Sequence, residues 1–256
     1  MDISNAIKQY NAIERHKEGR HGFGRFSPKA VLFDMDGVLY DSMRFHAKVW
    51  HESMRQYGIA MSEAQAYEHE GMRGMETIRE IALLQPGKEH LADKADEIYK
   101  VKSALFASYG EPSKMKGVEE LMRQMKADGM TICVVTGSGQ HSLLDRLERD
   151  FPDLLHRELM VTCFDVSEGK PKPYPYLQGL AKCGVEPWEA IVVENAPLGV
   201  QASVAAEIFT VAVNTGPLHD DKLLEKGANL LYHTMDEFHQ DWTTLLTLAR
   251  DTSPNP

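Results

Sequence analysis

Short apolar runs alternate with helical periods along the second half of the chain. From Lys116 onward, apolar residues recur every three or four positions in segments that end near a glycine, as at Gly129 and Gly184, which is typical of amphipathic helices. Between these segments, apolar runs predict buried strands at 131–135, 159–162, 190–193, 209–213 and 229–232. This alternation predicts an α/β fold with a Rossmann-like, doubly wound parallel sheet.

The first half of the chain has a single strand-like run, 30–33, followed only by helical spacing. No β-like run interrupts residues 43–109, and this stretch is too long for one crossover between strands. We therefore expect an inserted all-helical cap, with helices at 43–57, 62–70, 77–84 and 90–109. The expected division is a helical extension at 1–27, a core at 28–42 and 113–251, a cap at 43–112 and a disordered tail at 252–256.

Composition narrows the classes of protein to consider. The chain has 256 residues and a formal net charge of −10, which argues against a nucleic-acid partner because no basic stripe exists to replace phosphate counterions. Cys133, Cys163 and Cys183 are an odd number of cysteines with no metal-ligand spacing, and Cys133 and Cys163 are most simply small core residues in a reducing compartment. No apolar run is long enough to span a membrane, and the first residues lack the apolar core of a signal peptide. We expect a cytoplasmic monomer or weak dimer.

Two carboxylates follow the first strand directly. Asp34 and Asp36 must lie at or just past its carboxyl end, because a strand buried on both faces tolerates no acid inside it. In open α/β sheets this is the edge where ligands bind. Carboxylates this close repel each other unless a cation lies between them or one of them holds a proton. A polar turn after a strand is the alternative reading of the same residues.

Three further strand ends carry polar residues. Thr136, with Gly137 and Ser138, follows the second strand, and Lys170 follows the third between stiffening prolines. Glu194 and Asn195 follow the fourth strand.

Each of these residues has an alternative role. Thr136 also fits a helix cap, Lys170 a solvated loop lysine, and the pair at 194–195 a turn. Because parallel strands share direction, however, the four ends converge on one crevice. Oxygen ligands there suit Mg²⁺, and a lysine with free amides suits a phosphoryl group.

In these motifs the sequence resembles the haloacid dehalogenase superfamily of phosphotransferases, in its β-phosphoglucomutase-like subgroup with a helical cap. The resemblance covers about residues 29–250 and rests on Asp34-x-Asp36, Thr136, Lys170 and Glu194-Asn195, in order on the expected strand ends. Within the subgroup, residues 69–71 and 135–139 look most like inorganic pyrophosphatases.

The resemblance implies a mechanism residue by residue. Asp34 would attack phosphorus and form an aspartyl-phosphate, and Asp36 would act as general acid and then base. Thr136, the amides of Gly137 and Ser138, and Lys170 would bind the other phosphoryl oxygens. Mg²⁺ would be held by Asp34, the Asp36 carbonyl group, Glu194 and Asn195. Most members have an acid at position 195, so the carboxamide here is expected to lower Mg²⁺ affinity.

The cap is expected to set the substrate, with His46, Trp50, Glu70, Arg73 and Lys102 as candidate substrate contacts. His46 and Trp50 match the mutase pattern, although His46 also fits a partly buried helix position and Lys102 a solvated lysine. Glu70 stands where mutase-like sequences have a lysine, and Arg73 is offset by one position. Because an acid facing phosphate costs binding, hydrolysis of a small phosphorylated metabolite or pyrophosphate is favoured over mutase action, which stays open.

Two other classes compete with an enzyme of this kind. A receiver domain also groups acids, a threonine and a lysine around a phosphorylated aspartate, but it is far shorter and has no cap. A catalytically silent phosphate-ester binding protein is the second, and the joint presence of Asp34, Asp36, Thr136 and Lys170 counts against it.

Overall fold

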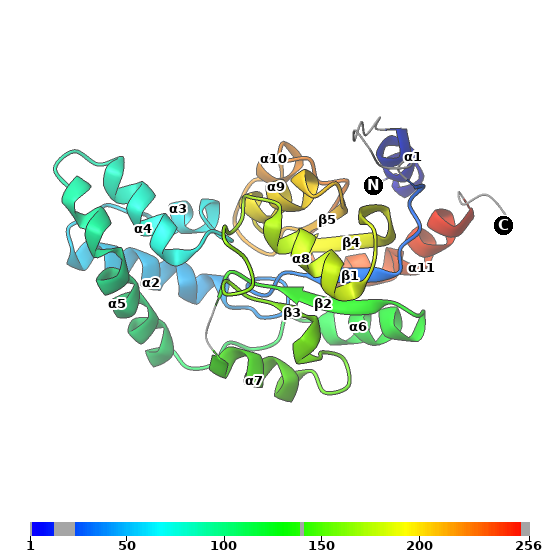
Figure 1. Cartoon of the computed structure of the whole chain (residues 1–256), viewed down its shortest axis with the longest axis horizontal. Helices are drawn as coiled ribbons and strands as arrows, with labels where there is room; N and C mark the ends of the chain where they lie inside the picture. The colour runs from blue at the N-terminus through cyan, green and yellow to red at the C-terminus, as the bar shows by residue number, and fades with distance from the viewer. Residues whose placement is uncertain (1, 13–23, 139–140, 252–256) are drawn as a thin grey trace.

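The core of the protein is a six-stranded, fully parallel sheet in the order β3-β2-β1-β4-β5-β6 (Figure 1). The computed structural model describes residues 2–12, 24–138 and 141–251. The strands are β1 (Ala30–Phe33), β2 (Thr131–Val135), β3 (Met160–Val161), β4 (Ala190–Glu194), β5 (Phe209–Val213) and β6 (Leu230–Tyr232). The order runs outward from β1 in both directions, so the sheet is doubly wound, as predicted.

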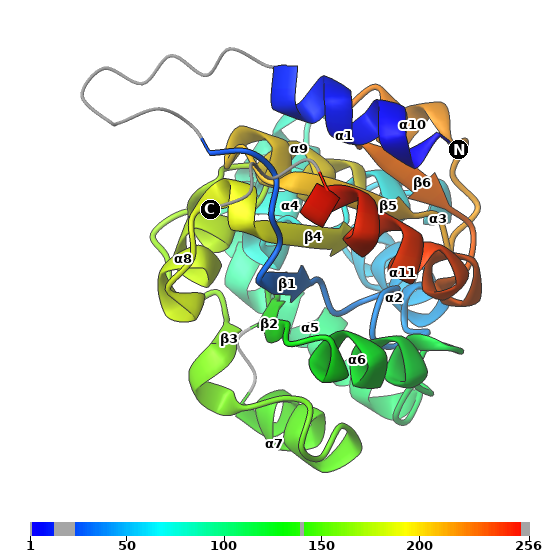
Figure 2. The same ribbon diagram turned by 90° about the vertical axis from the view of Figure 1, so that its right-hand side faces the viewer.

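Helices cover both faces of the sheet, because the apolar strands bury alternate side chains on each (Figure 2). One face packs against α6 (Val118–Ala127), α7 (His141–Asp150) and α11 (Met235–Asp251). The other packs against α8 (Tyr174–Cys183), α9 (Pro197–Ala205) and α10 (Asp221–Leu224). Two short 3₁₀ turns, η2 (Arg157–Leu159) and η3 (Pro187–Glu189), precede β3 and β4.

The cap is a separate helical layer with its own apolar cluster. It consists of α2 (Met43–Gln56), α3 (Glu63–Glu68), α4 (Gly74–Leu83), the 3₁₀ helix η1 (Glu89–Lys94) and α5 (Ala95–Ser108). The long helix expected at 90–109 is therefore divided, with its first turn wound as 3₁₀ helix. The helix expected at 77–84 begins three residues earlier, where Arg73 adopts the extended backbone of an N-cap residue.

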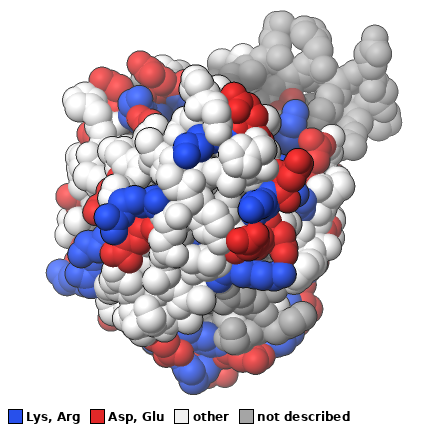
Figure 3. All heavy atoms as spheres, turned by 90° about the vertical axis from the view of Figure 1, so that its left-hand side faces the viewer, with Lys and Arg blue, Asp and Glu red and all other residues white. Residues whose placement is uncertain are grey.

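Two paired linkers join the cap to the core. The Asp41 amide donates to Ser113 O at 2.9 Å, and the Met115 amide donates to Leu39 O at 2.8 Å. This pairing carries the cap over the carboxyl ends of the strands, at the left of Figure 1. Seen from that end, Lys and Arg side chains are interspersed with Asp and Glu side chains over the face of the molecule (Figure 3).

Helix α1 (Ile3–Ala12) packs outside the core beside α11, at the end of the sheet away from the cap (Figures 1 and 2). Its Tyr10 ring is buried against Phe26 and Phe209, and its hydroxyl donates to Glu207 O at 2.8 Å. The linker at 13–23 and the tail at 252–256 lie outside the described residues. Among the helices that the structure describes, none is both long and apolar enough to cross a membrane.

Candidate active site

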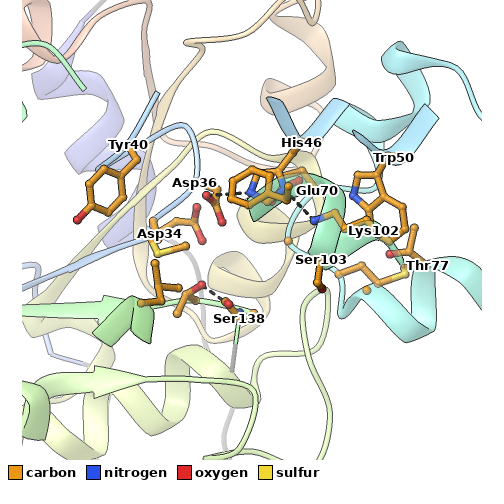
Figure 4. A pocket seen from close by; sticks show the side chains of 18 of the residues that line it. Asp34, Asp36, Tyr40, His46, Trp50, Glu70, Thr77, Lys102, Ser103 and Ser138 are labelled. Carbon is orange, nitrogen blue, oxygen red and sulfur yellow. Dashed lines mark hydrogen bonds and ion pairs between the residues drawn. The ribbon is translucent and has the colours of Figure 1, made fainter. Parts of the chain in front are cut away.

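A cavity of about 100 Å³ lies between the carboxyl ends of the strands and the cap (Figure 4). The core contributes Asp34, Asp36, Thr136, Gly137 and Ser138 to its wall, and the cap contributes His46, Trp50, Glu70 and Lys102. Nine of the residues singled out from the sequence therefore share one cavity. Lys170, Glu194 and Asn195 lie behind this wall, and Arg73 lies outside it.

Lys170 links two of the carboxylates from below the cavity floor. Its Nζ atom donates to Asp34 Oδ1 at 2.5 Å and to Glu194 Oε1 at 2.7 Å, and the residue is only 1% exposed. Burial alone would lower the pKa of Lys170, but the Asp34 and Glu194 carboxylates outweigh it and raise that pKa above its ordinary value. The lysine is therefore a permanent cation beside the Asp34 carboxylate.

Glu194 has no oxygen left for a cation. Its Oε1 accepts hydrogen bonds from Lys170 and the Tyr176 hydroxyl (2.6 Å), and its Oε2 accepts from the amides of Asn195 (3.0 Å) and Ala196 (3.1 Å). A carboxylate offers about four lone-pair positions, and all four are used here. The expectation that Glu194 is a direct Mg²⁺ ligand is therefore not met in this geometry, in which Glu194 holds Lys170.

Asn195 differs from Glu194 in the hydrogen bonding of its side-chain oxygen. Its Oδ1 atom is buried and has no hydrogen-bond partner among the residues that the structure describes, which is costly unless a cation or an ordered water satisfies it. A Cβ at Gly37, whose φ is +79°, would lie 1.9 Å from Asn195 Nδ2, so this approach of the carboxamide to the Asp36-Gly37 turn requires glycine.

The donor set fits Mg²⁺. Burial raises the pKa of Asp34 well above its ordinary value, with Lys170 opposing, and a divalent cation beside this carboxylate would stabilise its charged form. The described residues contain no group of three or more His, Cys, Asp or Glu side chains arranged as a metal site. The residues that would hold the ion are Asp34, the backbone carbonyl group of Asp36 and the carboxamide of Asn195. These are oxygen ligands of the kind that Mg²⁺ uses.

Asp36 is held by two neighbours. Its Oδ1 atom accepts from the Ser42 hydroxyl at 2.5 Å and lies 3.2 Å from His46 Nε2. Burial would raise the pKa of Asp36, but His46, Ser42 and the nearby Lys102 outweigh it and lower that pKa. Asp36 is thus oriented by hydrogen bonds while Asp34 is paired with a cation, so the two acids have different environments.

The cap extends this network away from the core. Lys102 Nζ lies 2.8 Å from His46 Nδ1, which places His46 between Lys102 and Asp36 (Figure 4). The Phe106 ring stacks on His46 at 4.0 Å, and burial lowers the pKa of Lys102 while Glu70 and Asp36 oppose that shift. Lys102 is 6% exposed, so the solvated alternative does not describe it.

In the loop between α3 and α4, the side chains of Glu70 and Arg73 contact different parts of the structure. Glu70 lines the cavity, and burial raises its pKa while the charges of His46 and Lys102 oppose that shift. Arg73 instead directs its guanidinium group to carbonyl oxygens of the core segment 163–167. The expectation that Arg73 contacts the substrate is therefore not met in this geometry.

Several lining residues were not singled out from the sequence. On α5, Tyr99 and Ser103 share with Lys102 and Phe106 one helical face, at spacings of three, four and seven residues. That spacing is a signal in the sequence that would have found them. Tyr40 and Arg146 line the opposite side of the cavity. They come from a linker and from α7, and only the packing of the core brings them there.

Comparison with known proteins identifies the family of the chain and supports its fold. The profile of the haloacid dehalogenase-like hydrolases matches residues 31–213, which contain all four strand-end motifs. The chain belongs to this family. Hexitol phosphatase A of Escherichia coli is 30% identical to this haloacid dehalogenase-like hydrolase over 209 residues, 82% of the chain and 92% of that protein. The β-phosphoglucomutase of Bacillus subtilis is 23% identical, covering 84% of the chain and 95% of that protein.

Among solved structures, a Bacteroides vulgatus protein with the provisional name β-phosphoglucomutase superimposes with a TM-score of 0.88. It is 46% identical, and the match covers 97% of this chain and 98% of that one. These relatives place the present hydrolase in the β-phosphoglucomutase-like subgroup. It is an enzyme of the phosphatase or phosphoglucomutase type.

Proposed function

We propose that this enzyme hydrolyses a small phosphorylated metabolite or pyrophosphate through an aspartyl-phosphate on Asp34, with Mg²⁺ as cofactor. The observation that carries the proposal is the pairing of Asp34 with Lys170 at one cavity wall that also holds Asp36 and Thr136. A carboxylate fixed by a buried cation cannot rotate away from the cavity, and this orientation suits a nucleophile.

In the first half of the reaction, an Asp34 oxygen attacks phosphorus while the bond from phosphorus to the leaving oxygen breaks. Asp36 gives its proton to that oxygen; a phosphate dianion entering beside Asp36 raises its pKa and favours the protonated form. The Thr136 Oγ1 atom already accepts from the Ser138 amide at 3.1 Å, so its own proton is directed elsewhere and is available to a phosphoryl oxygen.

In the second half, water attacks phosphorus, the bond from Asp34 to phosphorus breaks, and Asp36 accepts the proton of the water. After the product leaves, the lowered pKa of Asp36 in the free site favours loss of this proton, so Asp36 returns to its charged form. Lys170 balances the charge of Asp34 when the phosphoryl group leaves. When bound, Mg²⁺ would neutralise negative charge on the phosphoryl oxygens and on Asp34.

Three features support a small substrate. The cavity, about 100 Å³, is well below the roughly 300 Å³ at which pockets for drug-sized ligands begin. Glu70 adds a carboxyl group to the cap side of the cavity, where its negative charge would oppose a second phosphate, and Arg73 is held by core carbonyl groups. Relatives named hexitol phosphatase and phosphorylated carbohydrates phosphatase act on small phosphate esters, as their names state.

β-Phosphoglucomutase activity is the second candidate, and two observations favour it. The structural relative that is 46% identical carries that provisional name, and His46 and Lys102 form a polar chain from the cap to Asp36 that also suits an acceptor alcohol. In that reaction the alcohol of a sugar phosphate would replace water in the second half.

The decisive experiment measures phosphate release with Mg²⁺ from pyrophosphate, sugar phosphates and nucleotides, with conversion of β-glucose 1-phosphate followed in parallel. Asp34→Asn should reduce turnover of every substrate by at least about a thousandfold, since the nucleophile is lost, while Asp93→Asn, an exposed aspartate of the cap, should not. Equal turnover by wild type and Asp34→Asn would exclude Asp34 as the nucleophile. Binding of phosphate esters without any turnover would favour the silent binding protein.

A further inference from the structure

Arg73 belongs to the cap by sequence but is bound by the core. It directly precedes α4, and its Nη1 atom donates to Ser167 O at 2.7 Å. Its Nη2 atom donates to Cys163 O at 2.9 Å and also to Val166 O. All three acceptors lie in the segment between β3 and α8. One guanidinium group therefore joins two parts of the chain that are 90 or more residues apart.

The arginine is closely enclosed by the core segment that leads to Lys170. A Cβ at Gly169 would lie 2.9 Å from Arg73 Cγ, so the side chain lies directly across this glycine. Its Nε atom is buried and has no hydrogen-bond partner within the described part of the chain, and its side chain is 20% exposed. A planar donor group that matches several carbonyl oxygens at once is a geometry that arginine forms and lysine does not.

The loop between α3 and α4, which contains Gly71 and ends at Arg73, lies against the catalytic residues. A Cβ at Gly137 would be 3.4 Å from Gly71 O, and one at Gly71 would be 3.2 Å from the Cδ atom of Lys170. The backbone of Gly71 thus contacts both the Thr136 loop and Lys170. On the other side of the cavity, the ion pair of Glu68 with Lys222 (3.1 Å) is about half exposed, and such a pair contributes little.

We propose that Arg73 is a latch that keeps the cap closed over the cavity without a ligand, and so acts as a positioning residue for Glu70 and Lys170. A cap closed by the protein's own contacts does not require the substrate to supply a second anionic group. Binding energy of a small substrate is then not spent on closing the cap. The kinetic part of this inference rests on the proposed function, whereas the conformational part does not.

The test compares wild type with Arg73→Met and Arg73→Lys, and uses Arg55→Met, at an exposed cap arginine, as the matched control. Small-angle scattering without ligand should fit the closed structure for wild type and Arg55→Met. Arg73→Met should scatter as a more extended particle, and Arg73→Lys should resemble it because a compact ammonium group lacks the planar fork with which the guanidinium group reaches its three carbonyl acceptors. With the best substrate of the panel, kcat/KM of Arg73→Met should fall at least about tenfold, as the closed fraction falls.

Three results would overturn the latch. Wild type that is extended without ligand would show that Arg73 does not close the cap. Scattering of Arg73→Met identical to that of wild type would show that other contacts suffice. Unchanged scattering together with weaker inhibition by inorganic phosphate would make Arg73 a phosphate ligand. Failure of the proposed function has a different signature, because no variant would then release phosphate while the scattering comparison still decides the latch.

Discussion

Replacing Lys170 by methionine tests the buried ion cluster on which the active site is built. The Nζ atom lies 2.5 Å from Asp34 Oδ1 and 2.7 Å from Glu194 Oε1, and all three residues are buried. Removing one partner of a buried ion pair costs about 3–5 kcal/mol, because the remaining charge is left uncompensated. At about 2–4 °C per kcal/mol for a chain of this size, the melting temperature should fall by roughly 6–20 °C.

The cost should depend on pH, because the remaining carboxylates can each take up a proton. Burial already raises the pKa of Asp34, and loss of Lys170 would raise it further. A carboxyl group with a raised pKa in the folded state favours folding in its protonated form, and this contribution is lost as the pH rises through that pKa. The difference in unfolding free energy between wild type and Lys170→Met should therefore widen from about pH 5 to about pH 8.

Urea unfolding at several pH values and calorimetry without added metal measure both effects. The double variant Lys170→Met/Glu194→Gln should recover part of the loss, since it removes one of the two unpaired charges. Lys100→Met is the control: Lys100 is 74% exposed in its pair with Asp96, and its loss should leave the free energy of unfolding nearly unchanged. A loss below about 1 kcal/mol for Lys170→Met, or one that does not vary with pH, would refute the uncompensated-charge reasoning.

Two other substitutions test the metal site and the hydrogen bonds to Asp150. Asn195→Asp should lower the Mg²⁺ concentration for half-maximal activity or thermal stabilisation by about tenfold or more, because a carboxylate adds charge where Oδ1 now lacks a partner; an unchanged metal requirement would remove Asn195 from the ligands. Asp150 accepts from Tyr40 and Arg146, and although burial opposes them, these bonds and one from Arg149 lower the pKa of Asp150. Asp150→Asn should cost about 1–3 kcal/mol in urea unfolding near pH 7, and the gap should shrink below about pH 4, where wild-type Asp150 takes up its proton; a gap independent of pH would contradict this.

The sheet and the cap were predictable because their signals are local. Four of the strands lie within one residue of the runs expected at 131–135, 190–193, 209–213 and 229–232. The run at 159–162 forms only Met160–Val161 as strand, since it pairs on one side alone at the sheet edge. Residue 90 begins no α-helix, because the turn before α5 is wound as 3₁₀ helix, a choice that apolar spacing does not distinguish.

Which residues reach the carboxyl edge of the sheet could be predicted from the order of strands and polar residues along the chain. Parallel strands point one way, so Asp34, Thr136, Lys170 and Asn195 had to meet once the strands were recognised. The direction of each side chain at that edge depends on its neighbours in the folded protein. Glu194 and Asn195 are adjacent in sequence, yet one saturates its carboxylate on Lys170, Tyr176 and backbone amides while the other leaves an oxygen unpartnered.

In the cap, too, the contacts of individual side chains could not be predicted from the sequence. Helical spacing placed Lys102 on the last cap helix, but its burial against His46 and Trp50 depends on where the cap rests on the core. Arg73 was read as a substrate contact because cations suit phosphates, and it binds carbonyl groups of a segment 90 residues away instead. Periodicity is set by neighbours in the chain, whereas the partner of a long polar side chain is set by whichever surface folding brings within its reach.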